Sequence, residues 1–117
     1  MTKPFAKFAK REQIAHADWA RSIRLAGAGA IDADLGGGVI RQRIARQGEG
    51  KSGGYRTLIA FRSGVRAVYM YEFPKNERTN ITKRELAALR LLAADLLGAD
   101  ETKFKLSIED GSLIEIT

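Results

Sequence analysis

The residues best suited to chemistry in this chain are basic, and they gather at its centre. Residues 41–66 contain seven basic side chains and one acidic side chain, Glu49. This excess equals the net charge of +6 of the whole chain, whereas residues 95–117 carry six acidic residues and two lysines. Guanidinium and ammonium groups bind phosphates and stabilise developing negative charge. A polyanionic partner is therefore expected at the centre of the chain, with solvated surface charge as the alternative.

A glycine-rich stretch inside this segment raises the question of nucleotide binding. Residues 46–56 read RQGEGKSGGYR, with both a G-x-G-x-x-G spacing and a Gly-Lys-Ser triplet. A Walker loop needs a glycine where this chain has Ala45, and both fingerprints need a helix directly after the loop. The alternating β-branched and aromatic residues from Tyr55 to Arg62 predict a strand instead. Nucleotide binding is therefore rejected, and the glycines are interpreted as a loop between two strands.

Composition limits the other chemistries. The chain has no cysteine and one histidine, His16, so thiol catalysis is excluded and neither a metal site nor a cofactor is expected. No apolar run approaches the roughly 18 residues that cross a bilayer. With 117 residues, 44% of them hydrophobic, the chain is expected to form one soluble, cytoplasmic domain over residues 1–117.

The elements that must position the basic residues follow from hydrophobic periodicity and turn signals. Helices are predicted near residues 5–9, over about 13–30, and from the capping box at Thr82 and Glu85 to Gly98. The three strands expected between them form an antiparallel meander, over residues 39–45, 55–62 and 65–73. The tail is expected to form a short helical turn over 102–109 and a short strand over 113–116.

Strand alternation predicts which side chains share a face of this sheet. Arg56 falls on one face with Leu58, and Tyr69 shares a parity with Tyr71 and Phe73. One face is expected to pack on the helices through Trp19, Ile23, Leu86 and Leu89. The other is expected to expose cations and tyrosines, with Arg56 as an exposed strand arginine. Cations beside aromatic rings suit a nucleic-acid strand, because cations meet phosphates and rings stack on bases.

Three motifs in a fixed order resemble a known family. IDADLGGGVIRQRIA, then GKSGGYRTLIAFR, then FPKNERTNIT ahead of the ELAALRLLAADLL helix are similar to the RelE/HigB-like toxins of bacterial type II toxin–antitoxin modules. The resemblance implies an α+β, RelE/ParE-like toxin fold, with N-terminal helices packed on a twisted antiparallel sheet and a C-terminal helix. It also implies ribosome-dependent mRNA cleavage, and a cognate antitoxin, often a helix-turn-helix protein, as partner.

The resemblance also implies site residues. Cleavage by attack of the 2′-hydroxyl on the adjacent phosphate needs a base, a charge stabiliser and an acid. The catalytic candidates at matching positions are Arg56, as phosphate stabiliser, with Lys51 and Lys75, either of which could bind phosphate or transfer protons. The RNA-binding candidates are Arg43, Arg62, Tyr71 and Arg78. Two other functions stay open: a non-catalytic toxin that inhibits a protein such as DNA gyrase, and a plain RNA-binding module.

Overall fold

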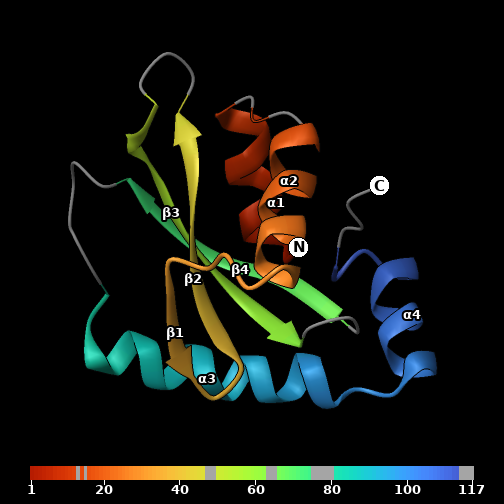
Figure 1. The fold of residues 1–117 in the computed structure, drawn as a ribbon. Coiled ribbons are helices and arrows are strands. Elements are labelled where there is room, and N and C mark those ends of the chain that lie inside the picture. The colour runs from red at the N-terminus through yellow and green to blue at the C-terminus, as the bar shows by residue number, and fades with distance from the viewer. Residues whose placement is uncertain (13, 15, 47–49, 63–65, 75–80, 114–117) are drawn as a thin grey trace.

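The computed structural model describes residues 1–12, 14, 16–46, 50–62, 66–74 and 81–113. The elements follow in the order α1 (Lys3–Arg11), α2 (His16–Gly27), β1 (Ala33–Gly36), β2 (Val39–Arg46), β3 (Gly50–Arg62), β4 (Arg66–Pro74), α3 (Lys83–Gly98) and α4 (Glu101–Glu109). The four strands form one antiparallel sheet in the order β1-β2-β3-β4. Two N-terminal helices, the sheet and the C-terminal helices make the expected α+β fold (Figure 1).

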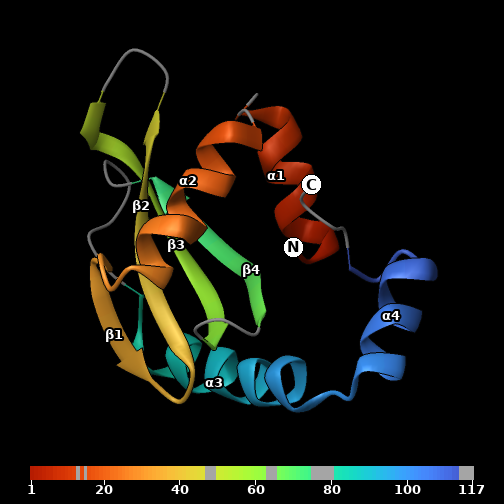
Figure 2. The same ribbon diagram turned by 45° about the vertical axis from the view of Figure 1, so that its right-hand side comes forward.

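The first face of the sheet packs on α1 and α2, which lie side by side in Figure 2. An aromatic cluster forms the centre of this layer. The ring of Phe5 lies 5.2 Å from that of Trp19 and 5.0 Å from that of Tyr69, measured between centroids. Trp19 is buried as predicted, and Ile23 packs against the same cluster while remaining partly exposed. This layer therefore fixes the N-terminal helices on β2, β3 and β4.

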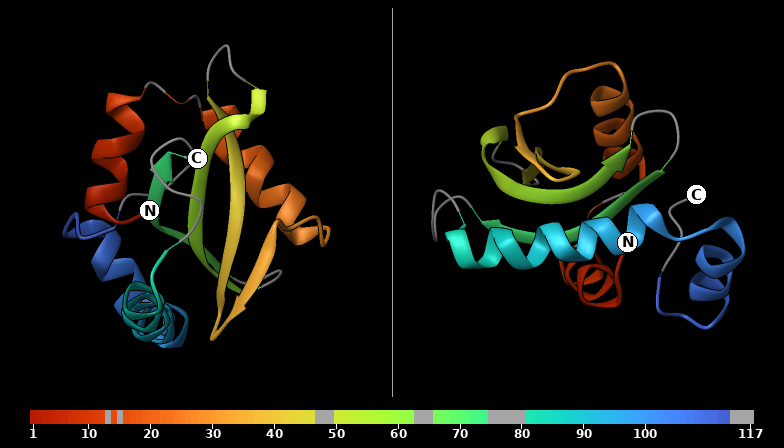
Figure 3. Two further views of the ribbon diagram at one scale, coloured as in Figure 1. Left: turned by 90° about the vertical axis from the view of Figure 1, so that its left-hand side faces the viewer. Right: turned by 90° about the horizontal axis from the view of Figure 1, so that it is seen from below.

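The second face of the sheet packs on α3, which runs across the strands in Figure 3. Val39, Leu58 and Ala60 of the strands are buried there with Ala93 and Leu97 of the helix. The predicted core residues Leu86 and Leu89 pack against this cluster and are partly buried. Both faces of the sheet thus carry helices. The expectation that one face would be left for cations and tyrosines is wrong over the part that α3 covers.

The N-terminus of α3 confirms the predicted capping box. The Thr82 hydroxyl accepts a hydrogen bond from the backbone N–H of Glu85 at 3.1 Å, and the Glu85 carboxylate accepts one from the backbone N–H of Thr82 at 3.0 Å. The second oxygen of the Glu85 carboxylate accepts a hydrogen bond from the Tyr71 hydroxyl at 3.1 Å. One carboxylate therefore both starts the helix and ties it to β4.

Two features of the glycine segments differ from expectation. No strand was predicted between the helix over 13–30 and the strand over 39–45, but Ala33–Gly36 forms β1, and Gly36, Gly37 and Gly38 turn into β2 with positive φ. A Cβ on Gly37 would lie 2.9 Å from Cγ of Arg90, so glycine also lets α3 approach the turn. In the second segment, β3 begins at Gly50, and most of the expected loop is strand. The strand predicted from Tyr55 to Arg62 is confirmed, and it stands where a nucleotide-binding fingerprint needs a helix.

A β-bulge in β4 changes the predicted faces. Leu58 lies opposite Tyr71, whereas Ile59 lies opposite Tyr69, so Met70 is an extra residue in β4. The side-chain alternation shifts by one at this point. Tyr69 consequently joins the cluster under α1 and α2, while Tyr71 and Phe73 belong to the cluster under α3. Their predicted common face is therefore wrong, because alternation along the sequence holds only while the strand stays regular.

Arg66 joins the C-terminal helices to the sheet. Its Nη1 donates to the carbonyl oxygens of Leu96 at 2.7 Å and Ala99 at 2.8 Å, and its guanidinium lies 3.8 Å from the ring centroid of Phe104. The predicted turn over 102–109 is the helix α4. Leu113 forms an isolated antiparallel bridge with Thr2, and the rest of the predicted final strand lies outside the described residues. Within the described segments, no helix has the length and apolar character needed to span a bilayer.

Candidate functional site

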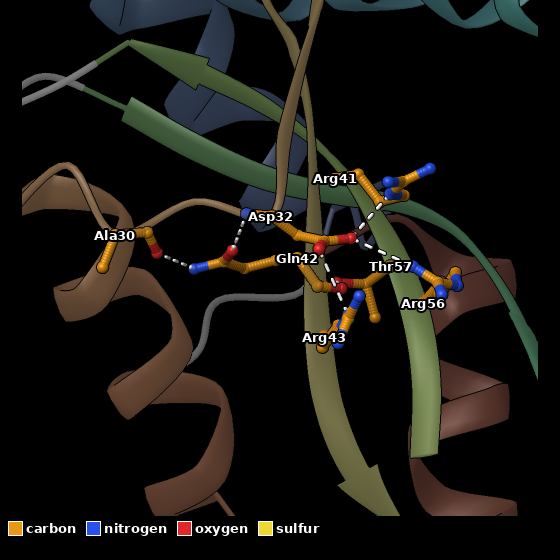
Figure 4. A network of polar contacts seen from close by, with 7 residues as sticks. All are labelled: Ala30, Asp32, Arg41, Gln42, Arg43, Arg56 and Thr57. Atoms are coloured by element: carbon orange, nitrogen blue, oxygen red, sulfur yellow. Dashed lines mark hydrogen bonds and ion pairs between the residues drawn. The ribbon is translucent and has the colours of Figure 1, made fainter. Parts of the chain in front are cut away.

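Three arginines converge on the carboxylate of Asp32, beside β1 and β2 (Figure 4). Nε of Arg41 lies 2.7 Å from Oδ2, and Nη1 of Arg56 lies 3.1 Å from the same oxygen. Nε of Arg43 lies 3.1 Å from Oδ1. We call these four residues the arginine cluster. Counted over these four residues alone, the three guanidinium groups and one carboxylate give a net charge of +2.

Strand pairing brings the arginines together. Arg43 of β2 lies directly opposite Arg56 of β3, and Arg41 lies opposite Leu58, two residues further along each strand. Like charges directly opposite each other in a sheet are destabilising. The Asp32 carboxylate offsets this repulsion, since each of its oxygens meets one of the two opposed arginines. The sheet register therefore builds a cationic site around the carboxylate of Asp32.

Gln42 holds the backbone of Asp32 in place. The Oε1 atom of this buried side chain accepts a hydrogen bond from the backbone N–H of Asp32 at 3.0 Å. Its Nε2 donates to the carbonyl oxygens of Ser22 at 3.1 Å and Ala30 at 3.0 Å. The amide thus links the C-terminal part of α2, the segment after it and β2. Because the other ends of these three bonds are backbone groups, the buried Gln42 side chain ties the position of Asp32 to the fold.

Burial differs sharply between the two opposed arginines. The Arg56 side chain is only 10% exposed, and its Nε has no hydrogen-bond partner among the described residues. The Arg43 side chain is 42% exposed. Arg56 is therefore not the exposed strand arginine expected from the sequence; it lies between Arg43 of β2 and Phe73 of β4 and pairs with Asp32. The Nε of Arg56 is buried, so a second anion would meet the cluster from the side of the more exposed Arg43. Phosphate groups match guanidinium donors well.

The other predicted site residues are more dispersed. The backbone of Lys51 belongs to β3, but its side chain lies outside the described part of the structure, as do Lys75 and Arg78 altogether. Tyr71 directs its hydroxyl to Glu85, so it contributes to packing of α3. Arg62 is exposed at the far end of β3, six residues from Arg56, which corresponds to about 20 Å of strand. Arg43 and Arg56 are thus the predicted pair that the structure brings together.

Asp32 and Arg41 were not among the site residues predicted from the sequence. Arg41 carried a usable signal, because it shares the strand parity of Arg43. No local sequence pattern pointed to Asp32 as a site residue. It precedes β1, and the antiparallel pairing of β1 with β2 brings its carboxylate to the arginines. Within the described residues, no group of three or more acidic, histidine or cysteine side chains is placed to hold a metal ion.

Glu72 on β4, a titratable side chain outside the arginine cluster, has a shifted pKa. Glu72 lies opposite Thr57 of β3, and burial raises the pKa of its carboxyl from the ordinary 4.5 to about 7, partly opposed by the charge of Arg11. The folded chain therefore holds this proton more tightly than the unfolded chain. The resulting stabilisation is complete below about pH 4.5 and is lost as the pH rises through 7.

Replacement of Glu72 should consequently change the pH dependence of stability. We expect Glu72→Gln to flatten the fall in unfolding free energy between pH 4.5 and 7. At pH 8 the variant should be more stable than the original protein by on the order of 1–2 kcal/mol, after allowing for solvent at a half-buried group. Urea unfolding at pH 5 and pH 8 measures both quantities. Glu109→Gln, at an exposed position of α4, is the control and should leave the pH profile unchanged.

Comparison with known protein families gives a match over nearly the whole chain. Residues 1–116 match the family model described as the RelE toxin of the RelE/RelB toxin–antitoxin system. Neither the curated proteins nor the solved structures gave a significant match.

Proposed function

The chain belongs to the RelE toxin family of the RelE/RelB toxin–antitoxin system, and on that premise we propose that it is a ribosome-dependent mRNA endoribonuclease. The observation that supports this activity best is the arginine cluster. Its four residues carry a net charge of +2 on one face of the sheet, and the guanidinium of Arg43 is partly exposed there. Such a site suits a phosphodiester, which is the group that an RNA-cleaving enzyme must bind and activate.

The proposed reaction is a transesterification within the mRNA. The ribose 2′-oxygen attacks the adjacent phosphorus, the bond from phosphorus to the 5′-oxygen breaks, and a 2′,3′-cyclic phosphate remains. One group removes the 2′-proton and another protonates the leaving 5′-oxygen. Arg56 and Arg43 stabilise the charge on the phosphate oxygens, and Lys51 and Lys75 remain the candidates for further phosphate contacts and proton transfer. The ribosome supplies orientation of the substrate.

The supporting RNA contacts divide by position. Arg62 and Arg78 are proposed to meet the RNA backbone away from the scissile phosphate. Tyr71 is proposed to act at the border of the site. Its hydroxyl bonds to Glu85. Leu58 lies directly opposite Tyr71 on β3 and is two residues from Arg56. Contacts with the phosphate backbone depend strongly on salt and carry little sequence information. Codon preference, if present, therefore has to come from other groups.

A cognate antitoxin is the partner expected of a toxin in this system. We propose a small helix-turn-helix protein that either covers the arginine cluster with acidic or apolar groups, or makes the complex too large to enter the ribosomal A site. Both partners would act in the cytoplasm. Co-expression of the toxin gene with its neighbouring gene should yield a stable complex. Full-yield expression of the toxin alone without any growth defect would contradict the proposed role.

Primer-extension mapping tests the activity directly. A reporter mRNA is followed during brief induction of the protein, with and without a start codon that permits translation. Cuts inside translated codons, absent from the untranslated reporter, are expected. Cuts in both reporters would contradict ribosome dependence, and intact mRNA alongside growth arrest would favour inhibition of a protein target.

A further inference from the structure

We propose that Asp32 is a positioning residue of this site, whose carboxylate aims Arg43 and Arg56 at one RNA phosphate and sets the charge of the cluster at two. This inference rests on the proposed function, because it assumes that the ligand is a phosphodiester. Asp32 itself does not contact the substrate. It acts through the arginines that it binds.

The ion-pair geometry carries the first step of the argument. One oxygen of Asp32 meets Arg43, and the other meets both Arg56 and Arg41. A guanidinium group is planar and presents its donors in a fixed fork, so one bonded nitrogen restricts where the remaining nitrogens point. Without the carboxylate, the directly opposed Arg43 and Arg56 would repel each other and turn apart. Asp32 is therefore the group that keeps their remaining donors convergent.

The charge balance carries the second step. An RNA phosphodiester has one negative charge, and the phosphorane-like transition state of its cleavage carries up to two. Two excess positive charges thus match the transition state better than the ground state, which is what accelerates a reaction. A cluster with three excess charges would also bind uncleaved RNA more tightly. Asp32 lowers the charge of the site by one.

The attachment of Asp32 carries the third step. Its backbone N–H donates to Gln42 Oε1 and to the Arg41 carbonyl oxygen, at 3.0 and 3.1 Å. Gln42 is anchored in turn on backbone carbonyls at Ser22 and Ala30. If phosphate displaced the Asp32 carboxylate on binding, these hydrogen bonds to the Asp32 backbone would serve no purpose. The arrangement suits a group that stays in place when RNA binds.

Two replacements separate charge from position. Asp32→Asn removes the charge and keeps the size, whereas Asp32→Glu keeps the charge and displaces the carboxylate by one methylene. Asp95→Asn, at an exposed position of α3, is the charge-matched control. Each protein is titrated by fluorescence anisotropy with a short RNA that carries a 2′-deoxy sugar at the scissile position, over a range of salt concentrations. Cleavage on ribosomes and the side-chain Nε–H NMR signals of Arg43 and Arg56 are then measured.

The expected results differ between the variants. With Asp32→Asn, the slope of log affinity against log salt should steepen by about 0.7, the value for one additional cation meeting single-stranded RNA. Its cleavage rate should nevertheless fall at least about tenfold, the order of loss expected for a misplaced charge contact. With Asp32→Glu, the salt slope should stay unchanged while cleavage falls and the Arg43 and Arg56 signals shift. Asp95→Asn should match the original protein in every measurement.

Other results would overturn the inference. If Asp32→Asn cleaves as fast as the original protein or faster, Asp32 competes with RNA and does not position the arginines. If both variants lose binding and cleavage only in proportion to their unfolded fraction, measured by circular dichroism, the role is structural. Should the original protein fail to cut mRNA at all, the proposed function fails. The NMR signals and salt slopes still decide whether Asp32 orders and neutralises the arginines.

Discussion

Replacing Arg56 with glutamine is expected to lower mRNA cleavage by about 10²- to 10³-fold, the usual loss when one charge-stabilising donor is removed from a transition state. Glutamine can still donate to Asp32 and fills most of the buried space, so the loss should lie mainly in the chemical step. Arg56→Ala should also abolish cleavage and toxicity, but with lower stability, because the side chain is buried and ion-paired. Single-turnover cleavage on ribosomes measures the rate, and thermal unfolding checks the fold.

The control for this experiment must lose one positive charge without losing a structural contact. Arg66 is unsuitable, since it bonds to carbonyl oxygens at the end of α3 and stacks on Phe104. Arg21→Gln is suitable, because Arg21 is exposed on α2. If Arg56→Gln and Arg21→Gln weaken cleavage equally and low salt rescues both, the arginines act only as a general electrostatic surface. A fully active Arg56→Gln variant would refute the assignment of the site to this part of β3.

Removal of the Trp19 side chain should cause the largest loss of stability among the core positions. Trp19 is buried between α2 and the sheet, with its ring centroid 4.9 Å from that of Tyr69 and 5.2 Å from that of Phe5. Trp19→Ala should lower the free energy of unfolding by about 3–5 kcal/mol, which is the typical cost of truncating a buried aromatic residue. The loss of aromatic pairing adds to the cavity. Guanidinium unfolding followed by circular dichroism gives the value.

Leu91→Ala is the matched control for this prediction. Leu91 is 73% exposed on α3, so its truncation should change the unfolding free energy by no more than about 0.5 kcal/mol. A loss below about 1 kcal/mol in Trp19→Ala would mean that the aromatic cluster does not stabilise the contact of α1 and α2 with the sheet. Cleavage activity per folded molecule should be unchanged in Leu91→Ala, because this residue takes no part in the arginine cluster.

The sequence by itself determined the elements whose signals are local. The capping box at Thr82 and Glu85 starts α3 where expected, because two side chains three residues apart satisfy each other's backbone groups. The alternation after Tyr55 requires a strand, which was enough to reject a nucleotide loop. The charge pattern and the ordered motifs indicated a basic toxin of the RelE type, and the family match confirms the family. The specific mRNA cleavage remains a proposal.

Only the tertiary structure decided which charges meet. The bulge at Met70 changed the face of Tyr71, and register pairing placed Arg43 opposite Arg56. Asp32 joined them across β1 and β2, and β3 and its neighbours buried an arginine that strand alternation alone had placed in solvent. These outcomes depend on contacts between segments up to 24 residues apart in the chain. Local periodicity reports the direction of a side chain from its own strand, but not which partner the next strand brings to it.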